Sequence, residues 1–419
     1  MTLWRAVAAG TMGAVLVGTA VASELRESPE SVSSITFGDE RTLFVADSHG
    51  ARVYAYQLPA MEAASRSQAF NLRDFGSAVS SRFGVAEANI LYHDIAVHPR
   101  SGHAYIALSV VNDGQIEPYV IRADPAGELS EVGLDTVEST SFPLSETPDE
   151  SVVFWRDIPA TTFTITDIDY ASGSLFIAGL SSGEFASTLR RISYPFEGRE
   201  SISRIEMYHA VHNQIETRAP IRAMAVMELD GAETIVAAYT CTPLVTVPVD
   251  QLVDGARVRG KTVAELGYGN TPLEVVPFEA MNMTGESESF VLVVNRERAA
   301  DLIRLRDLEA GHLGDGLTEP SKSVKAGVPS QSTPLAGVLQ MADQDPQFLL
   351  VLQRNLDTGG VDLVSIRKGA YLRLSNFVSE YNFPDYTYSP EGAQIRQFQN
   401  MLKIDEGFPE LLRDAEPEK

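Results

Sequence analysis

The sequence predicts an all-β protein in which one four-stranded unit occurs six times, and two observations lead to this prediction. First, six segments share one order: an apolar strand, a short turn rich in Gly, Asp, Ser or Pro, a second and strongly apolar strand, another turn, and a third strand. Second, the first buried position of these segments recurs at intervals of 52 to 73 residues, at Ile35, Ile95, Ile168, Met224, Val276 and Val338. A closed ring of six such antiparallel sheets is a six-bladed β-propeller.

The second and fourth strands of the units differ in polarity. Residues 43–46, 175–178 and 290–294 are continuous apolar runs, as expected for second strands that neighbouring sheets cover on both faces. A more polar fourth strand fits after each triplet, at residues 69–75, 129–135, 203–211, 261–266, 321–326 and 371–380. Separate β-sandwich domains are the alternative, but they do not explain a unit that recurs in near register.

The propeller is expected to span residues 23–380, between two terminal segments of different character. Residues 1–22 have the form of a signal peptide, with a positive charge at Arg5, a small apolar stretch and the small-x-small sequence Ala20-Val21-Ala22. Cleavage there predicts a periplasmic or secreted protein without a stable membrane span, and an uncleaved membrane anchor is the alternative. Residues 381–419 are expected to form a C-terminal extension with a short helix over 391–402 and an acidic tail.

Composition and missing motifs exclude several functions. The 419 residues include 33 basic and 57 acidic side chains, and the resulting formal charge of −24 argues against a nucleic-acid partner. A single cysteine, Cys241, excludes an intramolecular disulfide. The sequence holds no GxSxG elbow, P-loop, GxGxxG or CxxCH motif, so serine hydrolase, nucleotide and c-type haem functions find no support in it.

One unit carries a family resemblance. The segment "TLFVADSHGARVYAY" in the first unit resembles the NHL-type blade, in which an apolar strand ends in Asp and an Arg follows, here Asp47 and Arg52. The resemblance implies a structural role for this pair, and it does not extend to the other five units. NHL-like and gluconolactonase-like propellers include both binding modules and metal-dependent lactone or ester hydrolases, so the resemblance does not choose between these functions.

The strongest candidate site is the mouth of the central channel. In a propeller the innermost strands line the channel, and the two residues before each buried anchor are predicted to superpose there. These pairs are Ser33-Ser34, His93-Asp94, Thr166-Asp167, Arg222-Ala223, Glu274-Val275 and Ala336-Gly337. Asp94, Asp167, Glu274 and His93 together offer oxygen and imidazole ligands for a divalent cation such as Ca²⁺, or acid and base groups for catalysis. A channel filled by polar side chains and ordered water is the alternative.

Cys241 is predicted to lie in a turn on the same face as His93. His49 occupies the corresponding turn of the first unit, so a thiophilic metal site formed by Cys241, His49 and His93 is one hypothesis. The pairs His93 with His98 and His209 with His212 lack a zinc-motif context, and are interpreted as surface or hydrogen-bonded histidines.

Two functions follow from these observations. The leading hypothesis is an exported binding module that holds a small molecule, a peptide or a partner protein on its funnel face. The expected ligand-binding residues are His93, Asp94, Thr166, Asp167, Arg222, Glu274, Cys241 and His49. The longest insertion, residues 136–164 with Trp155, is expected to contribute to this surface. The alternative is a metal-dependent hydrolase, lactonase-like or esterase-like, with Asp94, Asp167 and Glu274 as ligands or base.

Overall fold

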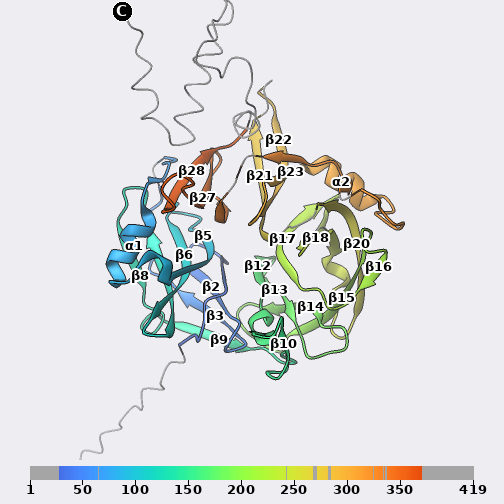
Figure 1. Ribbon diagram of the computed structural model, residues 1–419, viewed down its shortest axis with the longest axis horizontal. Coiled ribbons are helices and arrows are strands. Elements are labelled where there is room, and N and C mark those ends of the chain that lie inside the picture. The colour runs from blue at the N-terminus through green and yellow to red at the C-terminus, as the bar shows by residue number, and fades with distance from the viewer. Residues whose placement is uncertain are drawn as a thin grey trace, which may run out of the picture.

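The computed structural model describes residues 28–369, apart from residues 65, 242, 268–270, 282–284, 324, 334 and 336. In this part of the chain small antiparallel sheets are arranged around a common centre, as in a propeller (Figure 1). The α-helices here are α1 (Phe75–Phe83) and α2 (Leu305–Leu313), both on the outside of the ring. The predictions for residues 1–22, 371–380 and 381–419 lie outside the described residues.

Six strands form the wall of the central channel: β1 (Ser34–Phe37), β5 (Ile90–Val97), β12 (Asp167–Ala171), β17 (Ile221–Leu229), β21 (Pro272–Met281) and β26 (Val338–Asp343). They contact one another in the closed cycle β1, β12, β17, β21, β26, β5 and back to β1. This cycle differs from the chain order, because β5 lies between the first and the last of these strands. The second sheet in the sequence is therefore the neighbour of both the first and the last.

Each inner strand continues outward through three antiparallel partners. The first two sheets are β1-β2-β3-β9, with β2 (Thr42–Asp47), β3 (Arg52–Gln57) and β9 (Ser139–Pro143), and β5-β6-β7-β8, with β6 (Ala104–Asn112), β7 (Gln115–Ala123) and β8 (Leu129–Val132). The sheet of β21 contains β22 (Ser287–Asn295), β23 (Ala300–Arg304) and β25 (Gln331–Thr333). The sheet of β26 contains β27 (Phe348–Arg354), β28 (Val361–Arg367) and β4 (Asn71–Leu72).

The remaining two inner strands belong to one ten-stranded sheet. Its two halves are β12-β13-β14-β15, with β13 (Ser174–Leu180), β14 (Ser187–Ser193) and β15 (Ser201–His209), and β17-β18-β19-β20, with β18 (Ala232–Tyr239), β19 (Pro243–Pro248) and β20 (Arg257–Leu266). The halves join because the outer strands β15 and β20 pair in parallel, from Arg204 opposite Arg257 to Met207 opposite Gly260. Two short strands pair with these two central strands: β16 (Gln214–Glu216) pairs with β15, and β24 (Lys325–Gly327) pairs with β20.

The predicted fourth strands are right in three units and wrong in two. β8, β15 and β20 form at the predicted places. The strand expected over residues 69–75 shortens to β4, which pairs with β28 of the last sheet rather than with the first sheet. The first sheet is completed by β9, which follows the whole second sheet in sequence. The segment 321–326 contributes to β24, which pairs with β20, while β25 completes the sheet of β21. The sequence of a short polar strand does not indicate which sheet the strand will pair with.

The segment around β4 is fixed to the last sheet by side chains as well as by backbone pairing. The backbone N–H of Phe70 donates to Ser365 Oγ at 2.7 Å, and Arg73 forms an ion pair with Asp362 at 2.7 Å. The other Asp362 oxygen accepts the backbone N–H of Asp74 at 3.0 Å. An early part of the chain therefore completes a sheet built from the last described strands.

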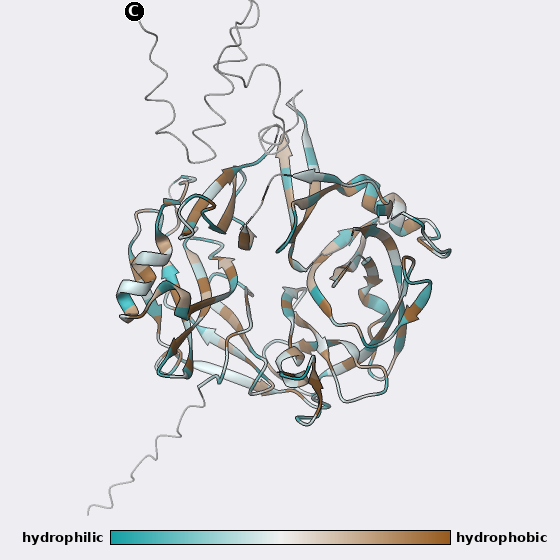
Figure 2. Cartoon of the chain, in the orientation of Figure 1, coloured by the Kyte–Doolittle hydropathy of each residue, from teal (hydrophilic) through white to brown (hydrophobic). Residues whose placement is uncertain are grey.

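Hydrophobic clusters fill the spaces between neighbouring sheets, and Figure 2 shows apolar residues concentrated in the strands. One cluster joins Phe44 and Ala46 of β2 with Ile177 of β13. Another joins Ile106 of β6 with Leu350 of β27. Each large apolar side chain buried in this way stabilises the fold by about 1.5–3 kcal/mol relative to exposure. The second strands are covered on both faces, as their apolar runs predict.

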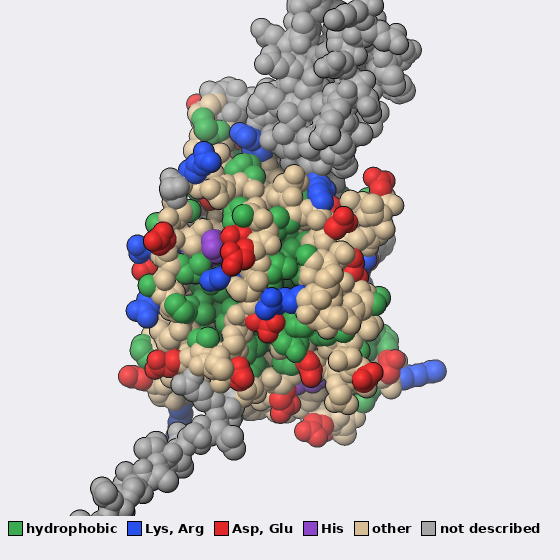
Figure 3. All heavy atoms as spheres, turned by 90° about the vertical axis from the view of Figure 1, so that its left-hand side faces the viewer, with side chains coloured by type: hydrophobic (Ala, Val, Ile, Leu, Met, Phe, Trp, Pro, Cys, Tyr) green, Lys and Arg blue, Asp and Glu red, His purple; other side chains and the backbone are tan. Residues whose placement is uncertain are grey.

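On the side of the molecule that carries α1, acidic and basic side chains are interspersed rather than segregated (Figure 3).

Among the described residues, no helix has the length and apolar character that crossing a membrane requires.

Candidate functional site

The channel-lining residues follow a common register that β-bulges define. In β5, β17, β21 and β26 the pairing shifts at a bulged residue, which is His93, Arg222, Leu273 or Leu339. The residue after each bulge lies at one level of the channel with the first residues of β1 and β12. This level consists of Ser34, Asp94, Asp167, Ala223, Glu274 and Gln340.

The predicted superposition agrees with this register in four units and fails in the last. The expected residues there were Ala336 and Gly337, of which Ala336 lies outside the described residues. The structure brings Gln340 to the channel instead, because the inner strand begins only at Val338 and is bulged at Leu339. In the unit of β21 the aligned residue is Glu274 rather than Val275, so it lies two positions before the predicted anchor Val276 instead of one.

Asp94, Asp167 and Glu274 form a carboxylate cluster in which the two aspartates are buried and Glu274 is half-buried. Ser34 Oγ donates to Asp94 Oδ2 at 2.7 Å and lies 3.2 Å from Asp167 Oδ1, so it links two of the carboxylates. Asp94 also accepts the backbone N–H groups of Ile35 and Ile95, at 2.7 and 2.6 Å. Asp167 accepts the N–H of Met224 at 2.7 Å. Glu274 of β21 interacts with Asp94 of β5 across one intervening inner strand, β26.

The cluster holds protons more tightly than ordinary carboxyl groups do. Burial raises the pKa of Glu274, and the charges of Asp94 and Asp167 raise it further. Burial and the charge of Asp94 likewise raise the pKa of Asp167, against the lowering effect of its backbone hydrogen bond from Met224. Three carboxylates cannot share a buried site unless protons or a cation neutralise part of their charge. The raised pKa values of Asp167 and Glu274 correspond to neutralisation by protons.

A cavity of about 170 Å³ lies at the end of the channel where residues directly preceding the cluster, such as His93, Thr166 and Leu273, line it. We call this end the funnel end and this space the funnel cavity, and its lining is mainly polar. The polar residues among those that line it are Ser33, Tyr92, His93, Thr162, Thr166, Arg222, Arg296 and Gln340. Three of the predicted site residues, His93, Thr166 and Arg222, thus meet in one cavity. Arg296 and Gln340 were missed, since neither lies at a predicted anchor.

The cavity combines cationic groups with buried atoms that have no protein partner. Burial lowers the pKa of Arg222, and the nearby charge of Arg296 lowers it further, which indicates two guanidinium groups close together. The Arg222 Nε and Gln340 Oε1 atoms are buried without a hydrogen-bond partner. Such atoms cost free energy unless water or a ligand satisfies them.

His93 lines this cavity and is neutral at pH 7. Burial lowers its pKa to about 4, and the charge of His49 contributes to the shift. Its Nε2 atom lies 2.9 Å from Ser109 Oγ, and its backbone oxygen accepts a hydrogen bond from Gln340 Nε2. His49, a predicted ligand-binding residue, is exposed and does not line this cavity.

The predicted insertion contributes directly to the cavity wall. After β9 it forms a two-stranded ribbon, β10 (Val153–Phe154) with β11 (Ile158–Pro159), and a 3-10 turn, η2 (Ala160–Phe163). The guanidinium of Arg222 lies over the ring of Phe163, 5.4 Å from its centroid. Gly179 allows this segment to approach β13, since a Cβ atom there would lie 2.1 Å from the Thr164 carbonyl oxygen. Trp155, at the turn of the ribbon, is 79% exposed.

A second cavity, of about 380 Å³, lies at the other end of the carboxylate cluster. It is lined by Asp94, Asp167 and Glu274, and also by Asp169 and Asp343. Burial raises the pKa of Asp169 to about 6, although it accepts the backbone N–H groups of Val226 and Tyr170. The channel is thus cationic at the funnel end and acidic at the other.

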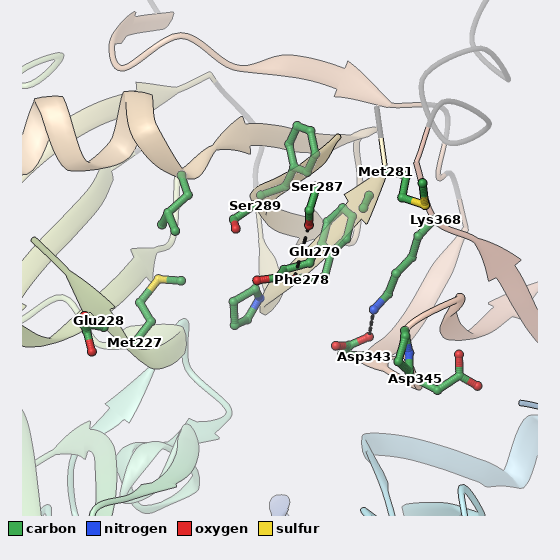
Figure 4. A pocket seen from close by; sticks show the side chains of 15 residues that line it. Met227, Glu228, Phe278, Glu279, Met281, Ser287, Ser289, Asp343, Asp345 and Lys368 are labelled. Atoms are coloured by element: carbon green, nitrogen blue, oxygen red, sulfur yellow. Dashed lines mark hydrogen bonds and ion pairs between the residues drawn. The ribbon is translucent and has the colours of Figure 1, made fainter. Parts of the chain in front are cut away.

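A third cavity, of about 720 Å³, was not predicted from the sequence. It lies between the ends of β17, β21 and β26 and is drawn in Figure 4. Lys368 points into it and forms an ion pair with Asp343, while Phe278 and Met281 supply apolar surface. Met281 directly precedes residues 282–284, which lie outside the described residues.

Cys241 lies in the turn between β18 and β19, as predicted, but its potential metal-ligand partners differ from the expected ones. Among the described residues, the group of three whose ligand atoms approach one another within 4.8 Å is Cys241 with His209 and His212. The structure therefore does not support a thiophilic site of Cys241 with His49 and His93.

Comparisons with known proteins give fold-level likeness alone. No protein-family model matches the sequence, and no curated protein matches it. Among solved structures, extracellular domains 1-2 of Drosophila Semaphorin 1b are 10% identical with a TM-score of 0.35, covering 81% of this chain and 88% of that chain. A structure of Drosophila Plexin A in complex with Semaphorin 1b matches with 10% identity, a TM-score of 0.33, and coverages of 81% and 85%. A streptogramin B lyase is 8% identical with a TM-score of 0.31, covering 82% of this chain and 86% of that chain.

Proposed function

We propose that this protein is an exported six-bladed β-propeller that binds a carboxylate-bearing ligand in the funnel cavity. The blade count is supported by the closed cycle of six inner strands and by the four strands that continue from each. In this interpretation the ten-stranded sheet is two blades whose outer strands, β15 and β20, have paired.

The observation that carries the proposed ligand class is the pair of guanidinium groups at the cavity. Arg222 and Arg296 face a polar space of about 170 Å³, and the buried Arg222 Nε has no protein partner. A planar guanidinium binds a carboxylate through two parallel hydrogen bonds. The net charge of −24 disfavours a polyanion, and the cavity volume suits one small anionic group.

The ribbon beside the cavity supports a ligand that extends beyond it. Val152, Val153 and Trp155 are 45%, 46% and 79% exposed on the segment that leads to Thr162. An apolar surface next to a charged pocket suits a peptide or small molecule with an acidic end and an apolar body. Thr162 and Thr166 would contact the acidic end.

Calorimetric titration with a short apolar peptide that has a free C-terminal carboxylate, and with the same peptide amidated, tests the proposal. We expect the free acid to bind and the amide to bind at least tenfold more weakly, since a charge-assisted hydrogen bond is worth about 1.5–3 kcal/mol. Arg222→Gln and Arg296→Gln should each weaken binding, whereas Arg259→Gln on the exposed face of β20 should not. Equal affinity for both peptides, or insensitivity to both funnel variants, contradicts the proposal.

A metal-dependent hydrolase is the second candidate, and the buried carboxylate cluster favours it. Asp94, Asp167 and Glu274 converge from three strands that are not neighbours in the ring, and carboxylate oxygens are the ligands that Ca²⁺ prefers. A cation bound there would displace the protons that Asp167 and Glu274 hold because of their raised pKa values.

Thermal unfolding with and without Ca²⁺ tests this candidate. A site specific to the folded state stabilises it by about 2.7 kcal/mol at a hundredfold excess over Kd. We expect Glu274→Gln to abolish a calcium-dependent shift in Tm, and a screen against lactones and esters would follow. A wild type whose Tm does not respond to Ca²⁺ excludes calcium at this site.

Export belongs to the same proposal. The sequence of residues 1–22 supports it, and N-terminal sequencing of the mature protein provides the test. We expect a mature chain that begins at or near Ser23 and is recovered outside the cytoplasm.

A further inference from the structure

A second group of chemically reactive side chains lies away from the channel, where the third and fourth inner-strand units meet. His209 is the last residue of β15, and His212 lies in the turn that leads to β16. Cys241 lies in the turn from β18 to β19. Parallel pairing of β15 with β20 brings the two turns to the same end of the ten-stranded sheet.

The three side chains are close enough to share one ion. A ring nitrogen of each histidine and Cys241 Sγ all lie within 4.8 Å of one another. A tetrahedral zinc site needs its nitrogen and sulfur ligands about 3.4–3.6 Å apart, as bond lengths of about 2.0–2.3 Å dictate. Small side-chain rotations therefore suffice to complete the geometry.

Glu216 orients both imidazole rings. Its Oε1 atom lies 2.8 Å from the Nδ1 atom of His209 and 2.8 Å from that of His212. A carboxylate that accepts Nδ1–H fixes the ring orientation and leaves Nε2 with the lone pair that binds a metal. This arrangement of carboxylate behind histidine is typical of protein zinc sites.

A buried carboxylate beside the histidines is an independent observation at this group. Glu265 Oε2 is buried, has no hydrogen-bond partner, and lies 3.8 Å from His209 Nε2. The other oxygen of Glu265 accepts the backbone N–H of Ala210 at 2.7 Å, which aims the carboxylate at the histidine turn. A buried carboxylate oxygen without a hydrogen bond costs free energy unless a positive charge lies close to it.

Backbone strain at Cys241 is consistent with a functional position. Its φ of 84° lies in the left-handed region, which L-residues other than Gly, Asn and Asp seldom adopt. The side chain is half-buried, while His212 is exposed, so an ion can reach the group from solvent.

We propose that His209, His212 and Cys241 bind a zinc ion, with Glu265 as the nearest additional oxygen ligand and Glu216 as the residue that positions the histidines. Thiolate and imidazole together select zinc over calcium or magnesium, which prefer oxygen ligands. The ion would tie the β15–β16 turn to the β18–β19 turn.

Metal uptake by the full-length mature protein tests the proposal, after removal of bound metal under non-thiol reducing conditions. We expect one equivalent of Zn²⁺ by elemental analysis, and a sulfur-to-metal charge-transfer band when Co²⁺ is used as the probe. Cys241→Ser should abolish this band, and His212→Gln should weaken Zn²⁺ binding. Glu216→Gln should weaken it by about 10- to 100-fold, the range for residues that orient metal ligands.

Controls separate metal loss from misfolding. His103→Gln, on the turn between β5 and β6, should leave zinc affinity and the cobalt spectrum unchanged. Circular dichroism of each metal-free variant shows whether the fold persists, and His212→Gln is the safest variant because the side chain is exposed. Failure of folded wild type to take up Zn²⁺, or a cobalt band that survives Cys241→Ser, overturns the proposal.

Discussion

Asp94 and Ile35 join two inner strands of the channel: the Oδ2 atom of Asp94 on β5 accepts the backbone N–H of Ile35 on β1 at 2.7 Å. Asp167 on β12 makes the same kind of bond to Met224 on β17. The carboxylates of the candidate site therefore also connect neighbouring sheets. Substitutions in the channel act on stability as well as on any ligand.

Asp94→Asn is expected to destabilise the protein by about 1–3 kcal/mol, the cost of leaving buried groups without partners. Both oxygens of Asp94 accept backbone N–H groups, so an amide NH₂ must face one of these donors. Urea denaturation at constant pH measures the change. A loss well below 1 kcal/mol would show that the backbone bonds contribute little.

The pH dependence of stability should reflect the raised pKa values of the cluster. Between the ordinary carboxyl pKa values of the unfolded chain and the raised values of the folded state, the folded state binds more protons than the unfolded chain. The free energy of unfolding therefore falls as pH rises through this range. This contribution is fully present below about pH 4, the usual pKa of carboxyl groups in an unfolded chain. It is lost as pH rises through the higher folded pKa values, that of Asp169 being about 6.

Glu274→Gln should flatten this pH profile, because it removes the group that burial and two neighbouring charges hold protonated. Urea unfolding at pH 5 and pH 8 compares the slopes of variant and wild type. If the free energy of unfolding changes equally between pH 5 and pH 8 in the two proteins, Glu274 is not a group whose proton stabilises the folded state.

Arg190→Met is expected to cost about 3–5 kcal/mol, because it leaves a buried charge unpaired. Arg190 is fully buried, forms an ion pair with Glu200 at 3.3 Å, and donates to the backbone oxygens of Ser145 and Glu146. Adding Glu200→Gln removes the orphaned charge and should recover part of the loss. Chemical denaturation of both variants decides this, and a double variant no more stable than Arg190→Met contradicts it.

Gly179→Ala should weaken ligand binding in the funnel and lower stability by about 1–3 kcal/mol, as overpacking does. The added methyl group would meet the Thr164 backbone, and the segment that carries Thr162 and Thr166 must then move. Gly360→Ala is the matched control, since its new methyl group would make ordinary contacts at 3.5 Å or more. Binding and thermal unfolding are measured for both variants.

The sequence predicts the inner parts of the fold better than its edges. Runs such as residues 43–46 are apolar because two neighbouring sheets cover them, and this burial is visible in the composition. β4 has two residues, one of them polar, and its partner β28 is set by the path of the chain around the ring. No local pattern encodes that choice.

The same limit applies to the sites. Asp94 and Asp167 could be aligned because each directly precedes a buried anchor. Gln340 could not, since the bulge at Leu339 shifts its strand by one position. His209 and Cys241 meet through the parallel pairing of two outer strands, which the repeat does not predict.

The pairing of β4 with β28 determines when the ring can close. Phe70 and Ser365, which bond across this sheet edge, are 295 positions apart. β4 therefore has no partner until nearly all of the described chain is available, and contacts of such sequence separation form slowly. A product that ends before β28 would keep several complete sheets but leave β4 unpaired and the edge of β27 exposed to other chains. Closure is thus a late folding step, and premature termination anywhere in the chain before Val361 is expected to yield aggregation-prone open forms rather than a smaller ring.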